Sequence, residues 1–225
     1  MSNVLRQTDR TTMSRHRERG SYDRESAYSI LDEGLVAHVG LTTDEGVVVV
    51  PMTYARCGDE LVLHGAVASR WLSSFADGKS ISVCVTLLDG LVLARSAFAH
   101  SMNYRSVVAF GIARPISIAA EKNTAFKALL DHLVPGRWSD CRQPDDKEIA
   151  ATTVLSMPLD EASVKIRSGP PKDAARDDQS PYWAGVIPLE MTAGEAQPDS
   201  ALHDGRQTPD YARNYVRWRA QQRAQ

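Results

Sequence analysis

The chain has 225 residues, of which 43% are hydrophobic and 24% are charged, and its formal net charge is −2. This composition is typical of a globular domain, and the small net charge argues against a general attraction to nucleic acid or anionic lipid. The three cysteines, Cys57, Cys84 and Cys141, form no C-x-x-C pair, which argues against a disulfide framework or a zinc site and favours a cytoplasmic protein.

The first half of the chain is expected to contain two helices and several short strands. Asp23 is a good N-cap for a helix that ends near Gly34, because Ala27, Ile30 and Leu31 then share one face. Strand-like runs follow at 35–41, 47–56 and 61–65, and a second helix is expected over 67–76.

Asp89-Gly90 is the strongest short-range hairpin signal in the chain, so we expect strands 80–88 and 91–95 to be joined by a turn at these residues. Further strands are expected over 104–116, 153–159, 162–167 and 183–189, with an amphipathic helix over 119–134. Near the C-terminus, a short helix would carry Tyr211, Tyr215 and Trp218.

Many short strands with a few inserted helices predict a closed β-barrel of the α+β type. We expect a flexible N-terminal arm over residues 1–18, a barrel domain over 19–194, and a polar C-terminal tail over 195–225 that contains the short helix. The run of polar residues after the predicted hairpin is a place to hold an anion at the rim of the barrel. It comprises Arg95, Ser96, His100, Ser101, Asn103, Arg105 and Ser106.

Several separated motifs share one resemblance. They are His16-Arg-Glu-Arg-Gly-Ser-Tyr-Asp23, Leu61-Val-Leu-His-Gly65, Ala68-Ser-Arg70, Ser101-Met-Asn-Tyr-Arg-Ser-Val107, Asp160-Glu-Ala-Ser-Val-Lys-Ile-Arg167 and Tyr182-Trp-Ala-Gly-Val-Ile-Pro188. In this order the motifs resemble the pyridoxamine 5′-phosphate oxidase-like flavin-binding proteins, and among them the nitroimidazole-resistance branch. The resemblance implies an antiparallel, Greek-key-like FMN-binding split barrel with a few peripheral helices. It also implies a homodimer with flavin at the subunit interface.

The resemblance assigns cofactor contacts to several groups of residues. Ser69 and Arg70 would bind the flavin phosphate, while Asn103, Arg105 and Ser106 would form a second set of donors. The remaining expected flavin contacts are Pro51, Met52, Thr53, Tyr54, His64, Val85, Thr86 and Trp183. Each has an ordinary structural alternative, such as a helix cap, a strand end, a polar seam or core packing. Lys165 and Arg167 share one face of their strand, where they either bind an anionic substrate or form the solvent-exposed face of an antiparallel sheet.

The expected function is that of an FMN-dependent oxidoreductase that moves hydride or electrons through flavin N5 to or from a small molecule. No G-x-G-x-x-G fingerprint is present, so NAD(P)H would act as a diffusing reductant. No catalytic residue is assigned beyond the candidate His64, and no metal site, nucleic acid or membrane partner is expected. One alternative is a non-catalytic flavin- or haem-binding protein with His64 or His100 as axial ligand. An F420-dependent reductase is a third reading, and FAD is an alternative to FMN.

Overall fold

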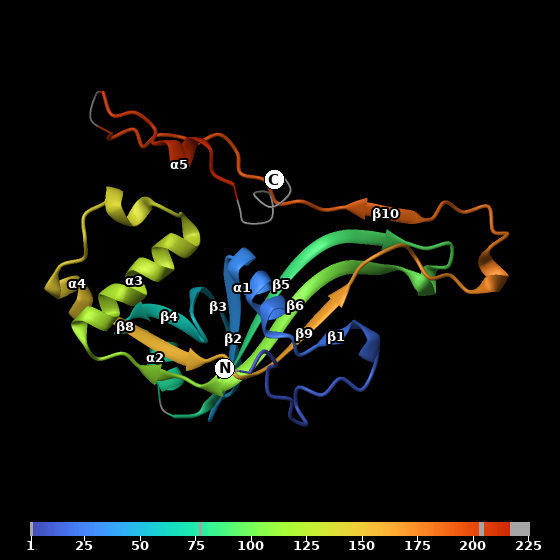
Figure 1. The fold of residues 1–225 in the computed structure, drawn as a ribbon, viewed down its shortest axis with the longest axis horizontal. Helices are drawn as coiled ribbons and strands as arrows, with labels where there is room; N and C mark the ends of the chain where they lie inside the picture. The colour runs from blue at the N-terminus through green and yellow to red at the C-terminus, as the bar shows by residue number, and fades with distance from the viewer. Residues whose placement is uncertain (1, 77, 203–204, 217–225) are drawn as a thin grey trace.

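The computed structural model describes residues 2–76, 78–202 and 205–216 (Figure 1). These residues form an antiparallel ten-stranded sheet in the order β1-β9-β6-β5-β2-β3-β4-β8-β7, with β10 paired to β5. The strands are β1 (Gly20–Ser21), β2 (Val36–Thr43), β3 (Gly46–Cys57), β4 (Glu60–Ala66), β5 (Ser80–Leu93), β6 (Ser101–Ile112), β7 (Arg114–Pro115), β8 (Thr152–Pro158), β9 (Glu161–Arg167) and β10 (Gly185–Pro188). The helices are α1 (Arg24–Glu33), α2 (Arg70–Ala76), α3 (Ala119–Leu133), α4 (Asp146–Ala150) and α5 (Asp210–Arg213). This is the expected α+β architecture, with a sheet that curves but stays open.

Helix α1 packs against the inner face of the curved sheet. The Asp23 carboxylate accepts a hydrogen bond from the Ser26 backbone N–H at 2.8 Å, which confirms the predicted N-cap. Ala27, Ile30 and Leu31 are buried in the main core, together with inward-facing residues of β2, β3, β4, β5, β6, β8 and β9. Side chains alternate along a strand, so every residue next to a core residue points to the outer face.

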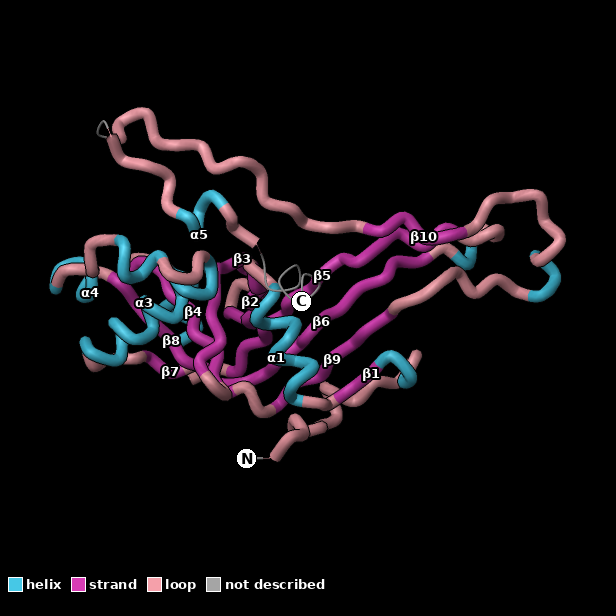
Figure 2. The backbone as a smooth tube through the Cα atoms, turned by 45° about the horizontal axis from the view of Figure 1, so that its top comes forward, coloured by secondary structure: helices cyan, strands magenta, loops and turns pink. Residues whose placement is uncertain are grey.

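Helix α3 covers only one end of that outer face (Figures 1 and 2). Its buried Ala125 and Leu129 pack on Ala55, Val62 and Val154, which come from β3, β4 and β8. No described helix covers the outer face of β2, β5, β6 and the first half of β3, and this face exposes large apolar residues. These include Val36, Val47, Val49 and Leu88. Most of the sheet therefore has one packed face and one bare face.

The predicted turn at Asp89-Gly90 is wrong. Strand β5 continues through both residues to Leu93, and the chain turns over residues 94–100 instead. The register of the pairing with β6 shifts between Leu88 and Gly90, so this stretch forms a β-bulge instead of a turn. Strand β10 pairs with Gly90–Leu93 from the other side, which keeps this stretch of β5 extended. A side chain at position 90 would meet the Ile187 carbonyl oxygen at 3.0 Å, so glycine suits the close approach.

Strands β5, β6 and β10 consequently form a three-stranded arm that projects from the barrel (Figures 1 and 2). One face of the arm is closed, because Val92 and Ala94 are buried. The Asp173 carboxylate helps to hold the tip, where it accepts hydrogen bonds from the Arg95 and Ser96 backbones. On the opposite face, one row across the three strands stays exposed. It consists of Met102, Leu91 and Ile187.

Both terminal segments contact the rest of the fold at particular residues. In the N-terminal arm, Leu5 is buried and its backbone N–H donates to the Tyr22 carbonyl at 2.8 Å. In the C-terminal tail, the Tyr215 hydroxyl donates to the Leu133 carbonyl at 2.7 Å. A short helix, α5, forms in the tail, but of the three predicted aromatic residues it contains Tyr211 alone: Tyr215 follows its end, and Trp218 lies outside the described residues. Within the described part of the chain, no helix is long and apolar enough to span a membrane.

Candidate functional site

A row of residues crosses the bare outer face from β9 to β4. The pairings Lys165–Ser106 and Ser106–Thr86 fix its first half. Val36 pairs with Thr53 farther along the row. The register of β2 on β5 pairs His38 with Cys84, and its extension by two residues sets Val36 opposite Thr86. The register of β4 on β3 pairs Tyr54 with Leu63, and its extension by one residue sets Thr53 opposite His64. The row thus brings together four of the predicted cofactor residues, Thr53, His64, Thr86 and Ser106, on one face of the sheet.

Three other predicted residues point the opposite way. Tyr54 is completely buried, and its hydroxyl donates to the Leu31 carbonyl at 2.5 Å. Val85 is buried in the same core, and Met52 packs against it. The side chains of Met52, Tyr54 and Val85 therefore serve the core of this protomer, whereas Pro51 and Thr53 lie on the outer side.

His64 stands at the α3 end of the row. Its Nδ1 is buried and has no hydrogen-bond partner among the described residues, and the same is true of Asn123 Oδ1 on α3. Burial lowers the pKa of His64 below its ordinary value, so the neutral imidazole is the stable form at neutral pH. A neutral, unpartnered imidazole beside an open sheet face is able to bind a ligand atom.

Ser69 and Arg70 lie at the start of α2, at the β3–β4 end of the molecule. Arg70 is exposed, its guanidinium carbon lies 4.2 Å from the Trp71 ring centroid, and Nη1 is 3.7 Å from the exposed Glu45 carboxylate. A surface pair of this kind contributes little stability. Arg70 is therefore accessible to a ligand.

The second predicted donor set does not gather into one site. Arg105 is engaged by two carboxylates: Nη2 donates to Glu33 at 2.8 Å and Nε donates to Asp89 at 2.9 Å. Asn103 Nδ2 donates to the Gly169 carbonyl at 3.2 Å, and its Oδ1 accepts from Arg167. Of the three residues, Ser106 alone lies on the row described above.

The last two predicted residues lie on the arm. His100 sits next to the tip, and its Nδ1 is 3.0 Å from the Ser96 carbonyl oxygen. Trp183 is exposed just before β10, with its indole against Gly185. Figure 1 places this part of the chain far from α2 and β4, so one protomer does not bring Trp183 to His64 or Arg70.

Sequence reasoning missed the burial of Arg167. Alternation along β9 places Lys165 and Arg167 on the outer face as expected, but Arg167 is only 6% exposed. The expectation of a solvent-exposed face is therefore wrong at this position. His38 and Cys84, which pair across β2 and β5 on the same face, were also not singled out. The alternation of buried and exposed positions along β2 and β5 is the sequence signal that could have identified His38 and Cys84.

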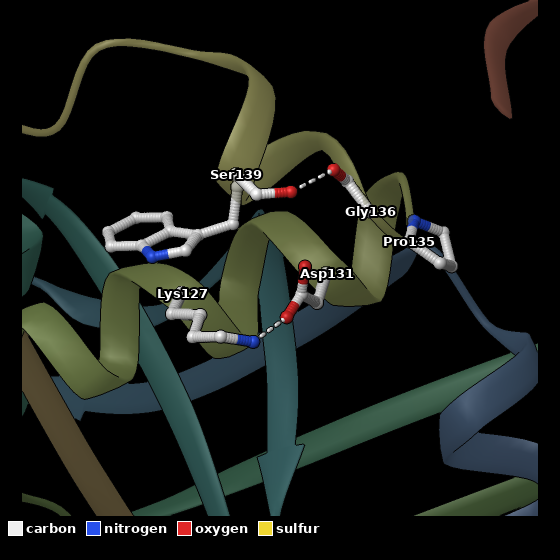
Figure 3. A pocket seen from close by; sticks show the side chains of 6 residues that line it. Lys127, Asp131, Pro135, Gly136 and Ser139 are labelled. Carbon is white, nitrogen blue, oxygen red and sulfur yellow. Dashed lines mark hydrogen bonds and ion pairs between the residues drawn. The ribbon is translucent and has the colours of Figure 1, made fainter. Parts of the chain in front are cut away.

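Two surface pockets lie outside the outer-face row. The pocket in Figure 3 has a volume of about 350 Å³ and is bordered by the last turns of α3 and the segment after it. There an ion pair joins Lys127 to Asp131, and the Ser139 hydroxyl donates to the Gly136 carbonyl at 3.1 Å. A second pocket of about 450 Å³ lies at the other end of α3. Neither is lined by a predicted cofactor residue.

Comparisons with known proteins identify the family and the fold of the chain. Residues 23–166 match the family model described as pyridoxamine 5′-phosphate oxidase. Flavocytochrome Anf3 from Azotobacter vinelandii is 38% identical with a TM-score of 0.87, over 91% of this chain and 95% of that one. The FAD and haem binding protein from Mycobacterium smegmatis is 37% identical with a TM-score of 0.84, over 88% of this chain and 98% of that one.

A putative 5-nitroimidazole antibiotic resistance protein from Bacteroides thetaiotaomicron is 24% identical with a TM-score of 0.54, over 65% of this chain and 86% of that one. This similarity concerns the fold alone. No curated protein matches the chain. Together the comparisons confirm the resemblance and the split-barrel fold expected from the sequence.

Proposed function

Since this chain belongs to the pyridoxamine 5′-phosphate oxidase family, we propose that it binds a flavin and a haem and moves electrons between them. The two similar structures that cover about nine-tenths of the chain are a flavocytochrome and an FAD and haem binding protein. The second of them supports FAD over the FMN expected from the sequence. The observation in this chain that carries the proposal is the unpartnered His64 at the end of a bare sheet face.

The outer-face row fits a flavin ring. Val36 offers an exposed apolar side chain, while the neighbouring Thr53 and Thr86 offer hydroxyls. A flavin ring needs both kinds of surface, because its benzene edge is apolar and its pyrimidine edge exchanges hydrogen bonds. In this proposal Thr53, Thr86 and Ser106 orient the ring, and Arg70 holds a phosphate.

His64 fits a haem ligand better than His100 does. Haem iron is bound by a neutral imidazole nitrogen, and burial favours the neutral form of His64. The ring of His64 makes no hydrogen bond with any described residue, whereas His100 Nδ1 already lies against a carbonyl. The apolar Val154 opposite His64 in β8 would help to keep water from the ligand.

A flavin supplies one- and two-electron chemistry when bound, and a haem supplies one-electron chemistry. The residues of the chain would bind, orient and shield these groups. We also propose that a small-molecule oxidant or reductant exchanges electrons with the protein. The proposed assembly is a homodimer. The exposed apolar row of the arm, formed by Met102, Leu91 and Ile187, supports self-association, because monomers rarely leave such rows bare.

The first test is the visible absorption spectrum of the purified protein, followed by acid release and mass analysis of what it carries. The proposal expects a Soret band together with flavin bands, and a released flavin with the mass of FAD. A flavin spectrum with the mass of FMN and no Soret band would restore the interpretation from sequence. A protein that takes up neither group would overturn the proposal.

A further inference from the structure

Arg167 is a buried cation without a buried counter-charge. Its Nη1 donates to the Gly169 carbonyl at 3.2 Å and to Asn103 Oδ1, and its Nη2 donates to the Pro170 carbonyl at 3.2 Å. All three acceptors are neutral, and Arg167 makes no ion pair with a carboxylate among the described residues. A buried guanidinium is normally paired, because burial without a partner charge is costly.

Two further cations lie beside Arg167. Lys165 is two positions away on the same face of β9, and its ammonium makes no hydrogen bond or ion pair with any described residue. Strand β1 pairs Gly20 with Lys165, which brings Arg19 next to the end of β9. The carboxylate recorded with Arg19 is that of Glu18, at 3.6 Å, and the Glu18 side chain is 61% exposed.

The charges in this cluster repel one another. Burial and the like charge of Arg19 lower the pKa of Arg167, although arginine stays protonated at any physiological pH. The fold therefore holds three cations together against one exposed acid. Glu161 is a second carboxylate on this face of β9, but its oxygens already accept hydrogen bonds from Arg6, Arg10 and Thr8. An external anion would stabilise the arrangement.

We propose that Arg167, Lys165 and Arg19 form a binding site for the phosphate group of a nucleotide-like small molecule. A guanidinium fork and an ammonium together match the several oxygens of a phosphate or diphosphate. Neighbouring Tyr104 and Ser106, which pair with Arg167 and Lys165, add hydroxyl groups on the same face. The cluster lies at the β9 end of the outer-face row, several strands from Arg70 at the β3–β4 end.

The phosphate has two possible sources. One is the diphosphate of the proposed FAD, and in that case the inference rests on the proposed function. The other is a separate ligand, such as the nicotinamide nucleotide expected as a diffusing reductant. Both sources share the chemistry of the site, and the experiment distinguishes them.

The test is calorimetric titration of the purified protein, with whatever cofactor it carries, by pyrophosphate at low ionic strength. Lys165→Gln removes one cation from a side chain with no recorded partner, so it should fold normally. We expect it to weaken pyrophosphate binding about tenfold, as loss of one charge-assisted contact does. The matched control is Arg114→Gln, which removes an exposed cation on β7 whose side chain has no partner among the described residues; this variant should bind as the wild type does.

Arg167→Lys keeps the charge and loses the fork, so it should weaken binding without removing it. Arg167 also donates to carbonyls of the segment after β9, so the Arg167→Lys variant could fail to fold. In that case the Lys165→Gln variant decides the outcome. A wild type that does not bind pyrophosphate in either its flavin-loaded or its flavin-free form would overturn the proposal. So would equal losses in the Lys165 and Arg114 variants.

The source of the phosphate follows from the flavin content. Binding of pyrophosphate to flavin-loaded protein supports a separate ligand, whereas binding only after flavin removal supports the FAD diphosphate. Because pyrophosphate is itself the probe, a protein without flavin or haem still answers whether the anion site exists. Failure of the proposed function is therefore distinguishable from failure of this inference.

Discussion

Arg105 donates to Asp89 through two of its nitrogens, Nε at 2.9 Å and Nη2 at 2.8 Å. The two residues lie beside the bulge of β5, where the arm leaves the barrel. The same guanidinium also contacts Glu33 at the end of α1, so one side chain connects the helix, the barrel and the base of the arm. Arg105 was expected to help bind an anion, but in this structure it pairs with two carboxylates of the protein itself.

We predict that Arg105→Ala destabilises the protein strongly. The substitution leaves Glu33 and Asp89 close together, largely buried and without a cation, which costs about 3 kcal/mol. Urea unfolding of this variant beside the exposed Arg114→Ala measures the difference. Equal midpoints for the two variants would show that the contacts contribute nothing.

Glu161 predicts a stability change at low pH. A hydrogen bond from Arg10 is the main cause that lowers the pKa of Glu161 to about 2, from a reference of 4.5. Because the folded-state pKa is the lower one, the contribution is complete above the reference value and is lost as the pH falls from 4.5 toward 2. Since Arg10 is partly exposed, we expect about 1–2 kcal/mol from this pair.

The measurement is the free energy of unfolding of the wild type and Glu161→Gln at several pH values. The wild type should be more stable at pH 6, and the gap should shrink below the reference pKa. A gap that is constant over the whole range would contradict the assignment. The same variant should also make residues 2–12 more sensitive to protease, because Glu161 anchors this segment through Arg6, Thr8 and Arg10.

Arg70 is the phosphate ligand predicted by resemblance, and its exposure makes the prediction easy to test. Arg70→Ala should leave the free energy of unfolding within about 0.5 kcal/mol of the wild type, as surface substitutions do. Flavin retention should weaken about tenfold if Arg70 binds the flavin phosphate. Equilibrium dialysis of Arg70→Ala and Lys165→Gln compares the phosphate site proposed at α2 with the one proposed on β9. Unchanged retention in Arg70→Ala would remove this residue from the site.

The sequence predicted the elements whose signals are local. Asp23 and the apolar spacing of Ala27, Ile30 and Leu31 predicted α1, and the same periodicity predicted α3. The turn at Asp89-Gly90 was predicted wrongly, because the pairing that overrides it comes from β10, about 95 residues later in the chain. Local turn chemistry carries no information about such a distant strand.

The candidate site was predicted in part for a similar reason. Alternation along a strand separates Thr53 from Tyr54, but only the tertiary fold tells which face is buried. The pairing of Arg105 with Glu33 and the burial of Arg167 depend on segments distant in sequence. Residue type alone showed neither that two carboxylates engage Arg105 nor that Arg167 is buried.

We propose that His64 binds a haem beside the flavin. The haem content of His64→Ala and of His100→Ala tests this role most directly. Each variant is purified, and its haem per chain is measured from the reduced Soret band together with flavin per chain. The account predicts that His64→Ala loses the Soret band and keeps its flavin, while His100→Ala keeps both. Full haem in His64→Ala, or its loss in His100→Ala alone, would contradict the account.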